Sequence, residues 1–190
     1  KFIVEFEKEL QTIDPSIAIP YWEWPADAEA PHNSPILSSK FYGGNGNPTD
    51  HCITDGPFKD FWLQYTNNVS PDHCITRNYA RDGTIPAFVE PEKIEEFMQL
   101  PILGDFSQKL EQEAHNPVHV GVGANFQTMA SPKDPLFFAL HAGVDRYWFE
   151  WQKQCDEQAR DLRPNPQDML MEPWGTPITS VLDTEGDARG

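Results

Sequence analysis

Three histidines lie close together in the stretch "HNPVHVGVGANFQTMASPKDPLFFALH", which covers residues 115–141. They are His115, His119 and His141, half of the six histidines in the chain. Residues four apart on a helix lie one above the other, so the first two imidazoles can point at a common centre. A third neutral nitrogen from another helix would leave one open position, which suits zinc, copper or iron.

Spacing alone does not establish this site. A His-x-x-x-His pair arises on helices by chance, and a single buried histidine is usually just hydrogen-bonded in a core. Spacing alone would also favour zinc. Pro117 lies between the first two histidines, and proline suits only the first turn of a helix. We therefore expect a helix to begin near Asn116, with His115 just outside it.

Two helices would have to position these histidines. The segment that ends at His115 starts with Asp105, an N-cap candidate, and predicts one of them. The strongest helical pattern in the chain covers 134–154, with Asp134 as its cap and a proline in its first turn. His141 falls on the buried face of this second helix.

Periodic apolar residues predict two more helices, over 1–12 and 91–100. Between them, frequent Pro, Gly, Asn and Asp residues indicate loops, with a candidate short helix at 57–65. Residues 160–190 are rich in proline and irregular, and we expect their end to be frayed. The first helix has no N-cap, so we expect the natural chain to begin further upstream.

Composition limits the partners. The chain has 190 residues, which is the length of one domain, and its 38% of hydrophobic residues indicates a globular protein. Its formal charge of −16 repels phosphate backbones and anionic lipid surfaces. No apolar run is long enough for a membrane span. We expect no nucleic-acid partner and no membrane partner.

The three cysteines cannot all pair within the chain. Cys52 and Cys74 lie in two copies of the pentapeptide "DHCIT" and are a disulfide candidate, which leaves Cys155 over. A disulfide would imply secretion or another oxidising compartment. The open sequon at Asn68 is a glycosylation candidate that points the same way.

The repeats leave an alternative, because each cysteine follows a histidine. His51 and His73 with these cysteines could form a zinc-like set. Adjacent side chains in extended backbone point in opposite directions, which disfavours that reading.

The text around the three histidines resembles the second copper-binding half of the type 3 copper proteins, namely tyrosinases, catechol oxidases and molluscan hemocyanins. The resemblance rests on "HNPVHVGVG", "SPKDPLFF" and "HAGVDRYWFEWQ", in that order. Upstream, "PYWEW" and "TDGPF" are similar to other family segments, and "VLD" resembles the close of the catalytic core. The resemblance therefore covers nearly the whole chain.

This resemblance implies a mainly α fold, part of a four-helix bundle that holds two coppers and is wrapped in long irregular loops. Residues 1–190 would form a single partial tyrosinase-like catalytic domain. Within it, 1–12 would be the helix that follows the first copper site, 105–154 the helices of the second copper site, and 160–190 the irregular C-terminal segment.

The resemblance also implies a ligand set. His115, His119 and His141 match the three ligands of the second copper, CuB, although Leu140 stands where many relatives have a further histidine. Asp145 matches a family aspartate that could orient a ligand ring. The alternative for Asp145 is an ion pair on the helix surface, with Arg146 or another neighbour.

Two further residues match catalytic positions. Glu111 matches the family glutamate that holds a water near the site, and Asn116 the asparagine that helps this water accept a phenolic proton. The stretch "EQE" could instead be a solvated helix face, but we prefer Glu111 to Glu113 as the base. By the same resemblance, Thr128 and Met129 are candidates for the substrate entrance.

A complete site of this family holds two coppers, and the resemblance gives this chain one of them. The family's first triad lies upstream of the 1–12 helix, and His32, His51 and His73 do not match it. We therefore expect a second chain or a missing N-terminal segment to carry the first copper site. Without it the chain would be unstable, and Cys155 could bond to the absent piece.

The implied activity is that of a phenol oxidase. It would use O2 and a dicopper centre to oxidise o-diphenols to o-quinones, with monophenols as further candidate substrates and melanin biosynthesis as a setting. Two alternatives stay open. One is an oxygen carrier like hemocyanin, and the other is a copper-binding fragment without catalysis.

Overall fold

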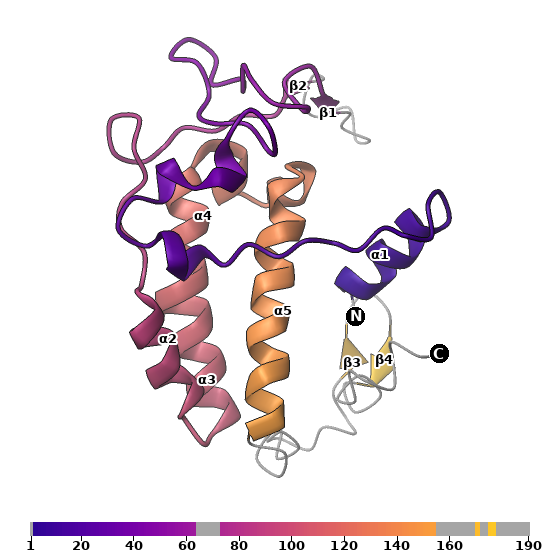
Figure 1. Cartoon of the computed structure of the whole chain (residues 1–190), viewed down its shortest axis with the longest axis vertical. Coiled ribbons are helices and arrows are strands. Elements are labelled where there is room, and N and C mark those ends of the chain that lie inside the picture. Colours follow the sequence, from indigo (N-terminus) through magenta and orange to yellow (C-terminus); the bar gives the residue numbers. More distant parts are fainter. Residues whose placement is uncertain (1, 64–72, 155–169, 172–174, 178–190) are drawn as a thin grey trace.

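The computed structural model describes residues 2–63, 73–154, 170–171 and 175–177 (Figure 1). Asn68 and Cys155, which carried predictions, lie outside the described residues, as does the end of the chain that we expected to be frayed. In the described part of the chain, no helix is both long enough and apolar enough to span a membrane.

The fold is mainly α, as predicted. Its α-helices are α1 (Phe2–Gln11), α2 (Pro91–Met98), α3 (Leu103–Lys109), α4 (Asn116–Val122) and α5 (Leu136–Gln154). Short 3₁₀ turns occur at Trp24–Asp27, Pro31–Asn33, Pro35–Leu37, Ala124–Gln127 and Ser131–Lys133. Figure 1 shows α2, the stacked pair α3 and α4, and α5 side by side, with α1 on the other side of α5. The four-helix bundle itself stays a prediction.

Strands are few and short. The strand β1 (Trp62–Leu63) pairs antiparallel with β2 (His73–Cys74), with Trp62 opposite Cys74. The strand β3 (Leu170–Met171) pairs antiparallel with β4 (Thr176–Pro177). The C-terminal segment is therefore not wholly irregular, and that prediction is wrong at these two strands.

The short helix that we considered at 57–65 is absent from its described part. Turns are followed there by β1, because the aromatic residues pair as a strand with the segment that carries Cys74. Asp105 is not an N-cap, since α3 already begins at Leu103. It lies in the first turn instead, where a carboxylate interacts well with the helix dipole.

Buried aromatic and aliphatic side chains hold the helices together. Phe106 of α3 stacks on Trp151 of α5 with ring centroids 4.8 Å apart, and both are almost fully buried. On the opposite side of α5, Phe6 of α1 stacks on Phe138 at 3.9 Å. These contacts fix α5 between α3 and α1.

The segment after α1 crosses α5 in extended form (Figure 1). Its Trp22 N–H donates to the carbonyl of Ala139 on α5 at 2.8 Å. The approach is so close that a Cβ at Gly143 would lie 2.6 Å from the Trp22 carbonyl oxygen, so only glycine fits there. From this crossing, residues 23–90 continue as loops and 3₁₀ turns over one end of the helices.

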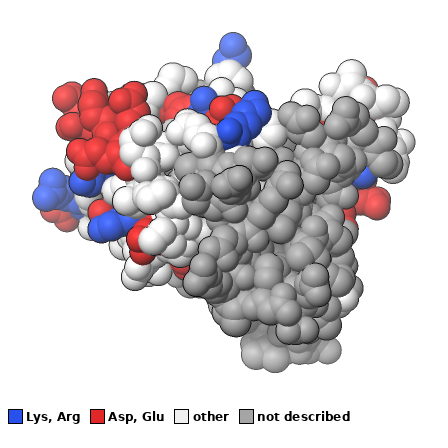
Figure 2. Space-filling model, turned by 90° about the horizontal axis from the view of Figure 1, so that it is seen from below, with Lys and Arg blue, Asp and Glu red and all other residues white. Residues whose placement is uncertain are grey.

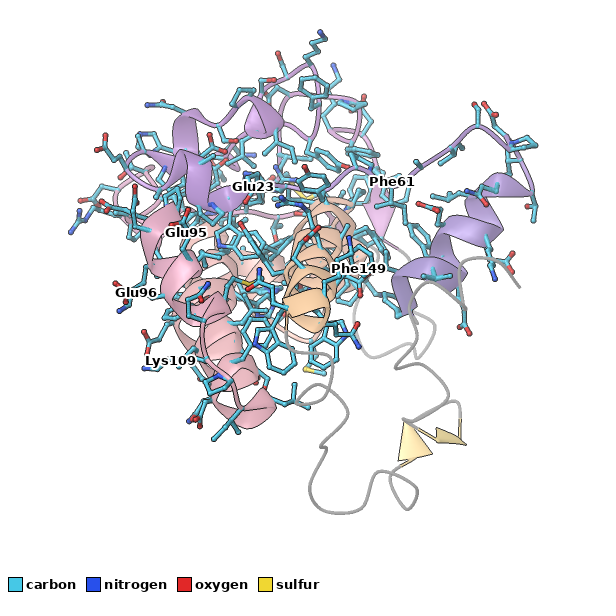
Figure 3. The ribbon with its side chains drawn as sticks, turned by 60° about the horizontal axis from the view of Figure 1, so that its bottom comes forward. Glu23, Phe61, Glu95, Glu96, Lys109 and Phe149 are labelled. Atoms are coloured by element: carbon cyan, nitrogen blue, oxygen red, sulfur yellow. A yellow bond between two sulfur atoms is a disulfide. The ribbon has the colours of Figure 1, made fainter. Side chains whose placement is uncertain are left out.

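Charged groups lie mostly on the outside. Acidic side chains gather on part of the surface in Figure 2, in keeping with the formal charge of −16. Glu95 and Glu96 of α2 and Lys109 of α3 point away from the helices in Figure 3. The polar groups that matter for chemistry are elsewhere, on the facing sides of α4 and α5.

Candidate metal centre

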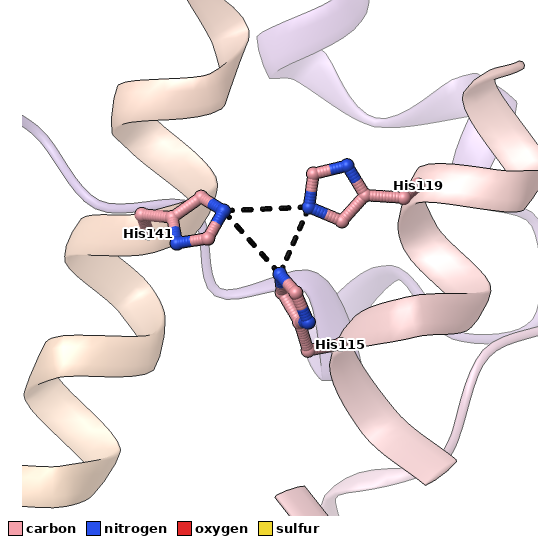
Figure 4. Close-up of side chains that lie close together, drawn as sticks. All are labelled: His115, His119 and His141. Carbon is pink, nitrogen blue, oxygen red and sulfur yellow. Dashed lines mark hydrogen bonds between the residues drawn. The ribbon is translucent and has the colours of Figure 1, made fainter. Parts of the chain in front are cut away.

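The three histidines singled out by their spacing converge on one point (Figure 4). The Nε2 atom of His115 is 2.8 Å from that of His119 and 3.3 Å from that of His141, and the Nε2 atoms of His119 and His141 are also 3.3 Å apart. A point equally distant from all three lies about 1.8 Å from each, close to a metal–imidazole bond of about 2.0–2.1 Å. The triangle therefore has the size of a metal site.

A π-helical turn at Leu110–His115 brings the first two histidines into register. It joins α3 to α4, and the Asn116 N–H donates to the carbonyl of Glu111, five residues earlier. Pro117 explains the turn, because it has no N–H and its ring would collide with the carbonyl four residues before it in a regular α-helix. Such turns are frequent at functional sites.

This turn corrects one expectation. The α4 segment does begin at Asn116, but it continues from α3 through the π turn without a break. His115 is therefore inside the helical run and not outside it. Asp134 does act as predicted at the start of α5, where its carboxylate accepts a hydrogen bond from the Leu136 N–H at 3.0 Å.

Hydrogen bonds at the far side of two rings orient them. The His115 Nδ1 lies 3.1 Å from the side-chain oxygen of Asn116, and the His119 Nδ1 lies 2.7 Å from the carbonyl oxygen of Phe126. Both oxygens are acceptors, so each Nδ1 carries the proton and donates it. The lone pair of each ring is then on Nε2, at the point of convergence.

Burial keeps the imidazoles neutral. It lowers the pKa of His115 to about 4 and that of His141 to about 3, with a further contribution from the neighbouring histidines. Burial also lowers the pKa of His119, against the opposing effect of the Phe126 carbonyl. Neutral imidazole is the form that binds metals. Lone pairs this close repel one another unless a cation lies between them, so the donor set fits a metal ion.

Comparison with known proteins identifies the metal. A sequence model of the common central domain of tyrosinase matches residues 1–154. The chain belongs to the tyrosinase family. Membership in this family implies copper as the metal and oxidoreductase as the class of protein, and it replaces the zinc that spacing alone favoured.

Relatives in this family come mainly from bacteria and fungi. The chain is 30% identical over 200 residues to a tyrosinase of Streptomyces antibioticus, covering 96% of this chain and 72% of that protein. It is 35% identical over 170 residues to a tyrosinase of Streptomyces glaucescens, covering 81% and 60%. It is also 30% identical over 230 residues to a grixazone synthase of Streptomyces griseus, covering 96% and 74%.

A solved structure shares the fold. The polyphenol oxidase of Thermothelomyces thermophila superposes with a TM-score of 0.66 over 84% of this chain, at 21% sequence identity. The matched region is 55% of that polyphenol oxidase chain. The present chain thus spans about half the length of this tyrosinase-like neighbour.

Aromatic rings cover two of the tyrosinase-type histidines. Phe137 stacks on His141 with ring centroids 3.9 Å apart, and Phe126 stacks on His119 at 4.7 Å. These faces keep water from the rings, which explains why burial dominates their pKa shifts. Sequence reasoning had quoted both phenylalanines within motifs or loops but had given them no role.

A groove of about 500 Å³ opens beside the histidines. His115 and His141 line it together with apolar side chains of α1, α3 and α5, namely Phe2, Ile3, Phe106, Leu110, Val144 and Trp148. Glu111 and Asp145 line the same groove. The two carboxylates that the sequence singled out therefore lie next to the candidate ligands.

The surroundings of Asp145 separate its two interpretations. Arg146 forms its ion pair with Glu23, across the molecule, and not with Asp145. Partial burial in the groove raises the pKa of Asp145. Among the described residues, however, no hydrogen bond joins it to a histidine, so ring orientation by Asp145 stays a prediction.

The two glutamates of "EQE" differ in the same way. Glu113 forms an exposed ion pair with Lys109, which is the solvated helix face that the sequence allowed. Glu111 instead lines the groove beside His115. The geometry favours Glu111 as the candidate base, although its role is not tested by these contacts. Asn116 contacts the site through His115.

Thr128 and Met129 lie on the loop that follows α4. The Thr128 hydroxyl donates to the Asn125 carbonyl at 2.9 Å, and Met129 is 98% exposed. Neither residue lines the groove beside the histidines. Their assignment to a substrate entrance stays a prediction.

The cysteine prediction is confirmed, because Cys52 and Cys74 form a disulfide with their Cα atoms 5.6 Å apart. Both thiols are consumed, so the zinc-like alternative with His51 and His73 is wrong. Across the described ranges, the histidine triad is the one group of three or more His, Cys, Asp or Glu side chains arranged for a metal.

Sequence reasoning missed a buried ion pair near the site. Arg77 donates from Nε and Nη2 to the two carboxylate oxygens of Asp134, at 2.8 and 2.9 Å, and both side chains are fully buried. A further bond goes from Arg77 Nη1 to the Gly43 carbonyl at 2.6 Å. The partners are 57 positions apart, and no local signal links an arginine in a loop to the cap of a distant helix.

Proposed function

We propose that this chain supplies one copper-binding half of a phenol oxidase that uses O2 to convert o-diphenols to o-quinones. The observation that carries the proposal is the set of three converging Nε2 atoms, two of them fixed as lone pairs by hydrogen bonds at Nδ1. His115, His119 and His141 would hold the second copper, CuB. A complete site would contain two coppers, one of them bound here.

In the overall reaction, two o-diphenols lose four electrons and four protons, and one O2 is reduced to two waters. Bound copper would supply the electron transfer and the activation of O2. The protein groups would handle protons and orientation. Glu111, at the groove beside His115, would hold a water that accepts the phenolic proton, with Asn116 assisting. Asp145 would help to orient a ligand ring.

The first copper site would come from residues outside this chain, in a second chain or an N-terminal segment. The groove beside the triad supports this, because its apolar lining adjoins the open side of two histidines. The other histidines, His32, His51 and His73, belong to no cluster of metal-binding side chains in the described residues. Helices that fill the groove could bring a second triad close to the first.

The disulfide supports a secreted protein or another oxidising compartment, because such bonds persist where thiols are not kept reduced. Glycosylation at Asn68 would agree with that location.

The test compares two substitutions in the complete protein. His115→Asn removes a proposed ligand, and His51→Asn changes a loop histidine whose positive φ of 61° asparagine tolerates. We expect His115→Asn to lose the copper held by this chain and all o-quinone formation from a small catechol. His51→Asn should keep both. Copper is counted by elemental analysis, and turnover is followed by O2 uptake and quinone absorbance.

Three results would contradict the proposal. Reversible O2 binding without quinone formation by the copper-loaded protein would identify an oxygen carrier. Copper binding without any O2 chemistry would identify a non-catalytic copper protein. Full copper content in His115→Asn would show that the triad is not the site.

A further inference from the structure

The Phe126 carbonyl that holds His119 sits on an unusual turn. After α4 ends, the chain passes through Gly123 at φ 71° and Ala124 at φ 48° before it enters the 3₁₀ turn Ala124–Gln127. A left-handed conformation is disfavoured for any residue with a Cβ, so Ala124 does not adopt it by its own preference. Something outside the turn must hold it in place.

Thr76 and Asn125 provide that hold. The Asn125 side-chain oxygen accepts from both the Thr76 backbone N–H at 2.9 Å and the Thr76 hydroxyl at 2.5 Å. In return, the Asn125 backbone N–H donates to the Thr76 hydroxyl oxygen at 3.3 Å. Three hydrogen bonds thus join two residues that are 49 positions apart, and one of the two directly precedes Phe126. We call this pair the Thr76–Asn125 clamp.

The segment that carries Thr76 is itself anchored. The Asn78 and Ala80 N–H groups donate to the Val122 and Gly121 carbonyls, at 3.1 and 3.0 Å, and so cap the C-terminal end of α4. A Cβ at Gly123 would lie 2.2 Å from the Asn78 carbonyl oxygen, which shows how closely the two segments pack. Thr76 is therefore a fixed point against which the turn is held.

We propose that Thr76 and Asn125 are positioning residues for the copper ligand His119, acting through the Phe126 carbonyl. The inference rests on the proposed function and extends it to residues that touch neither metal nor substrate. With the carbonyl in place, the proton of His119 stays on Nδ1 and the lone pair stays on Nε2. Without the clamp the carbonyl moves away, both tautomers of the neutral ring are populated, and part of the Nε2 population carries a proton that blocks metal binding.

Thr76→Val tests the clamp, because it removes the hydroxyl but keeps the side-chain shape and the backbone N–H. Thr76→Ser restores the hydroxyl. Thr84→Val is the matched control, since the Thr84 hydroxyl also bonds a carbonyl, that of Arg81 at 2.7 Å, within a turn away from the histidines. All variants are made in the complete protein, and thermal melting confirms that each is folded.

Two measurements are made on each variant. Long-range ¹H–¹⁵N NMR of the metal-free protein reports whether the His119 proton is on Nδ1 or Nε2. Competition with a chelator reports the affinity for Cu(I). We expect Thr76→Val to mix the two tautomers of His119 and to weaken Cu(I) binding by about 10- to 100-fold, the usual effect of losing a group that orients a metal ligand. Thr76→Ser and Thr84→Val should resemble the wild type.

The outcomes separate this inference from the proposed function. An unchanged tautomer and affinity in Thr76→Val would overturn the clamp, as would equal losses in Thr76→Ser or Thr84→Val. A wild-type protein that binds no copper would overturn the proposed function instead, while the NMR result on metal-free protein would still decide whether the clamp orients His119.

Discussion

The helical half of the molecule (residues 91–154) and the loop wall that covers one end of it (residues 13–63 and 73–90) are stabilised differently. The helical half packs buried aromatic and aliphatic side chains, such as Phe106 against Trp151, along continuous helices. The loop wall has little regular structure and is held at a few points, which are the Arg77–Asp134 pair, the Cys52–Cys74 disulfide and the Thr76–Asn125 clamp.

The difference separates two tasks at the metal centre. All three candidate ligands come from the helical half, so their approximate convergence needs only helix packing. The orientation of His119, and the cap at the start of α5, depend on groups of the loop wall. Damage to the helical half should therefore reduce stability in proportion to lost packing, whereas damage to the loop wall should be concentrated at its anchors.

The largest effect should come from breaking the buried ion pair. Arg77→Met leaves the Asp134 carboxylate buried without its partner, which costs about 3–5 kcal/mol of unfolding free energy. Arg81→Met is the control, because Arg81 is exposed, and it should change stability by less than about 0.5 kcal/mol. Urea unfolding of the complete protein measures both. Equal, small losses would show that the loop wall does not depend on this anchor.

The disulfide should rank second. It links residues 22 positions apart, and removing such a closed loop costs about 2–4 kcal/mol, chiefly by freeing the unfolded chain. The double substitution Cys52→Ala with Cys74→Ala should lower the unfolding free energy by this amount. Adding reductant should destabilise the wild type to the same extent and leave the double variant unchanged. A wild type that is insensitive to reductant would contradict the prediction.

A core substitution in the helical half tests the other side of the comparison. Val118 lies next to His119 on α4 and is fully buried. Val118→Ala removes two methyl groups, and lost burial with the remaining cavity should cost about 2 kcal/mol. Copper affinity should nevertheless stay close to that of the wild type, in contrast to Thr76→Val. A tenfold loss of affinity in Val118→Ala would mean that orientation is not confined to the loop wall.

The same division explains what could be predicted from the sequence. The helical half has strong apolar periodicity, so α2, α5 and the buried position of His141 followed from local patterns. The π turn did not, because the pattern shows that Pro117 is a problem for an α-helix but not how the backbone solves it. Within the loop wall, the disulfide was found through a repeated pentapeptide.

The remaining anchors left no trace in the sequence. Thr76 and Asn125 are 49 positions apart, and the Arg77–Asp134 pair joins partners separated by 57. Threonine, asparagine and a single arginine are common in loops, and nothing local indicates which distant group each will meet. Contacts of this kind are fixed by the tertiary fold, so only the structure identifies them.

The smallest effect should come from the surface of the helical half. Lys109 forms an ion pair with Glu113 one turn later, and both side chains are more than 40% exposed. Exposed pairs of this kind contribute about 0–1 kcal/mol, because water screens the charges and holding two long side chains costs entropy. Lys109→Ala should therefore change the unfolding free energy by less than about 0.5 kcal/mol. A loss approaching that of Arg77→Met would show that surface charges on α3 stabilise the fold as much as the buried anchor does, and the distinction between the two regions would fail.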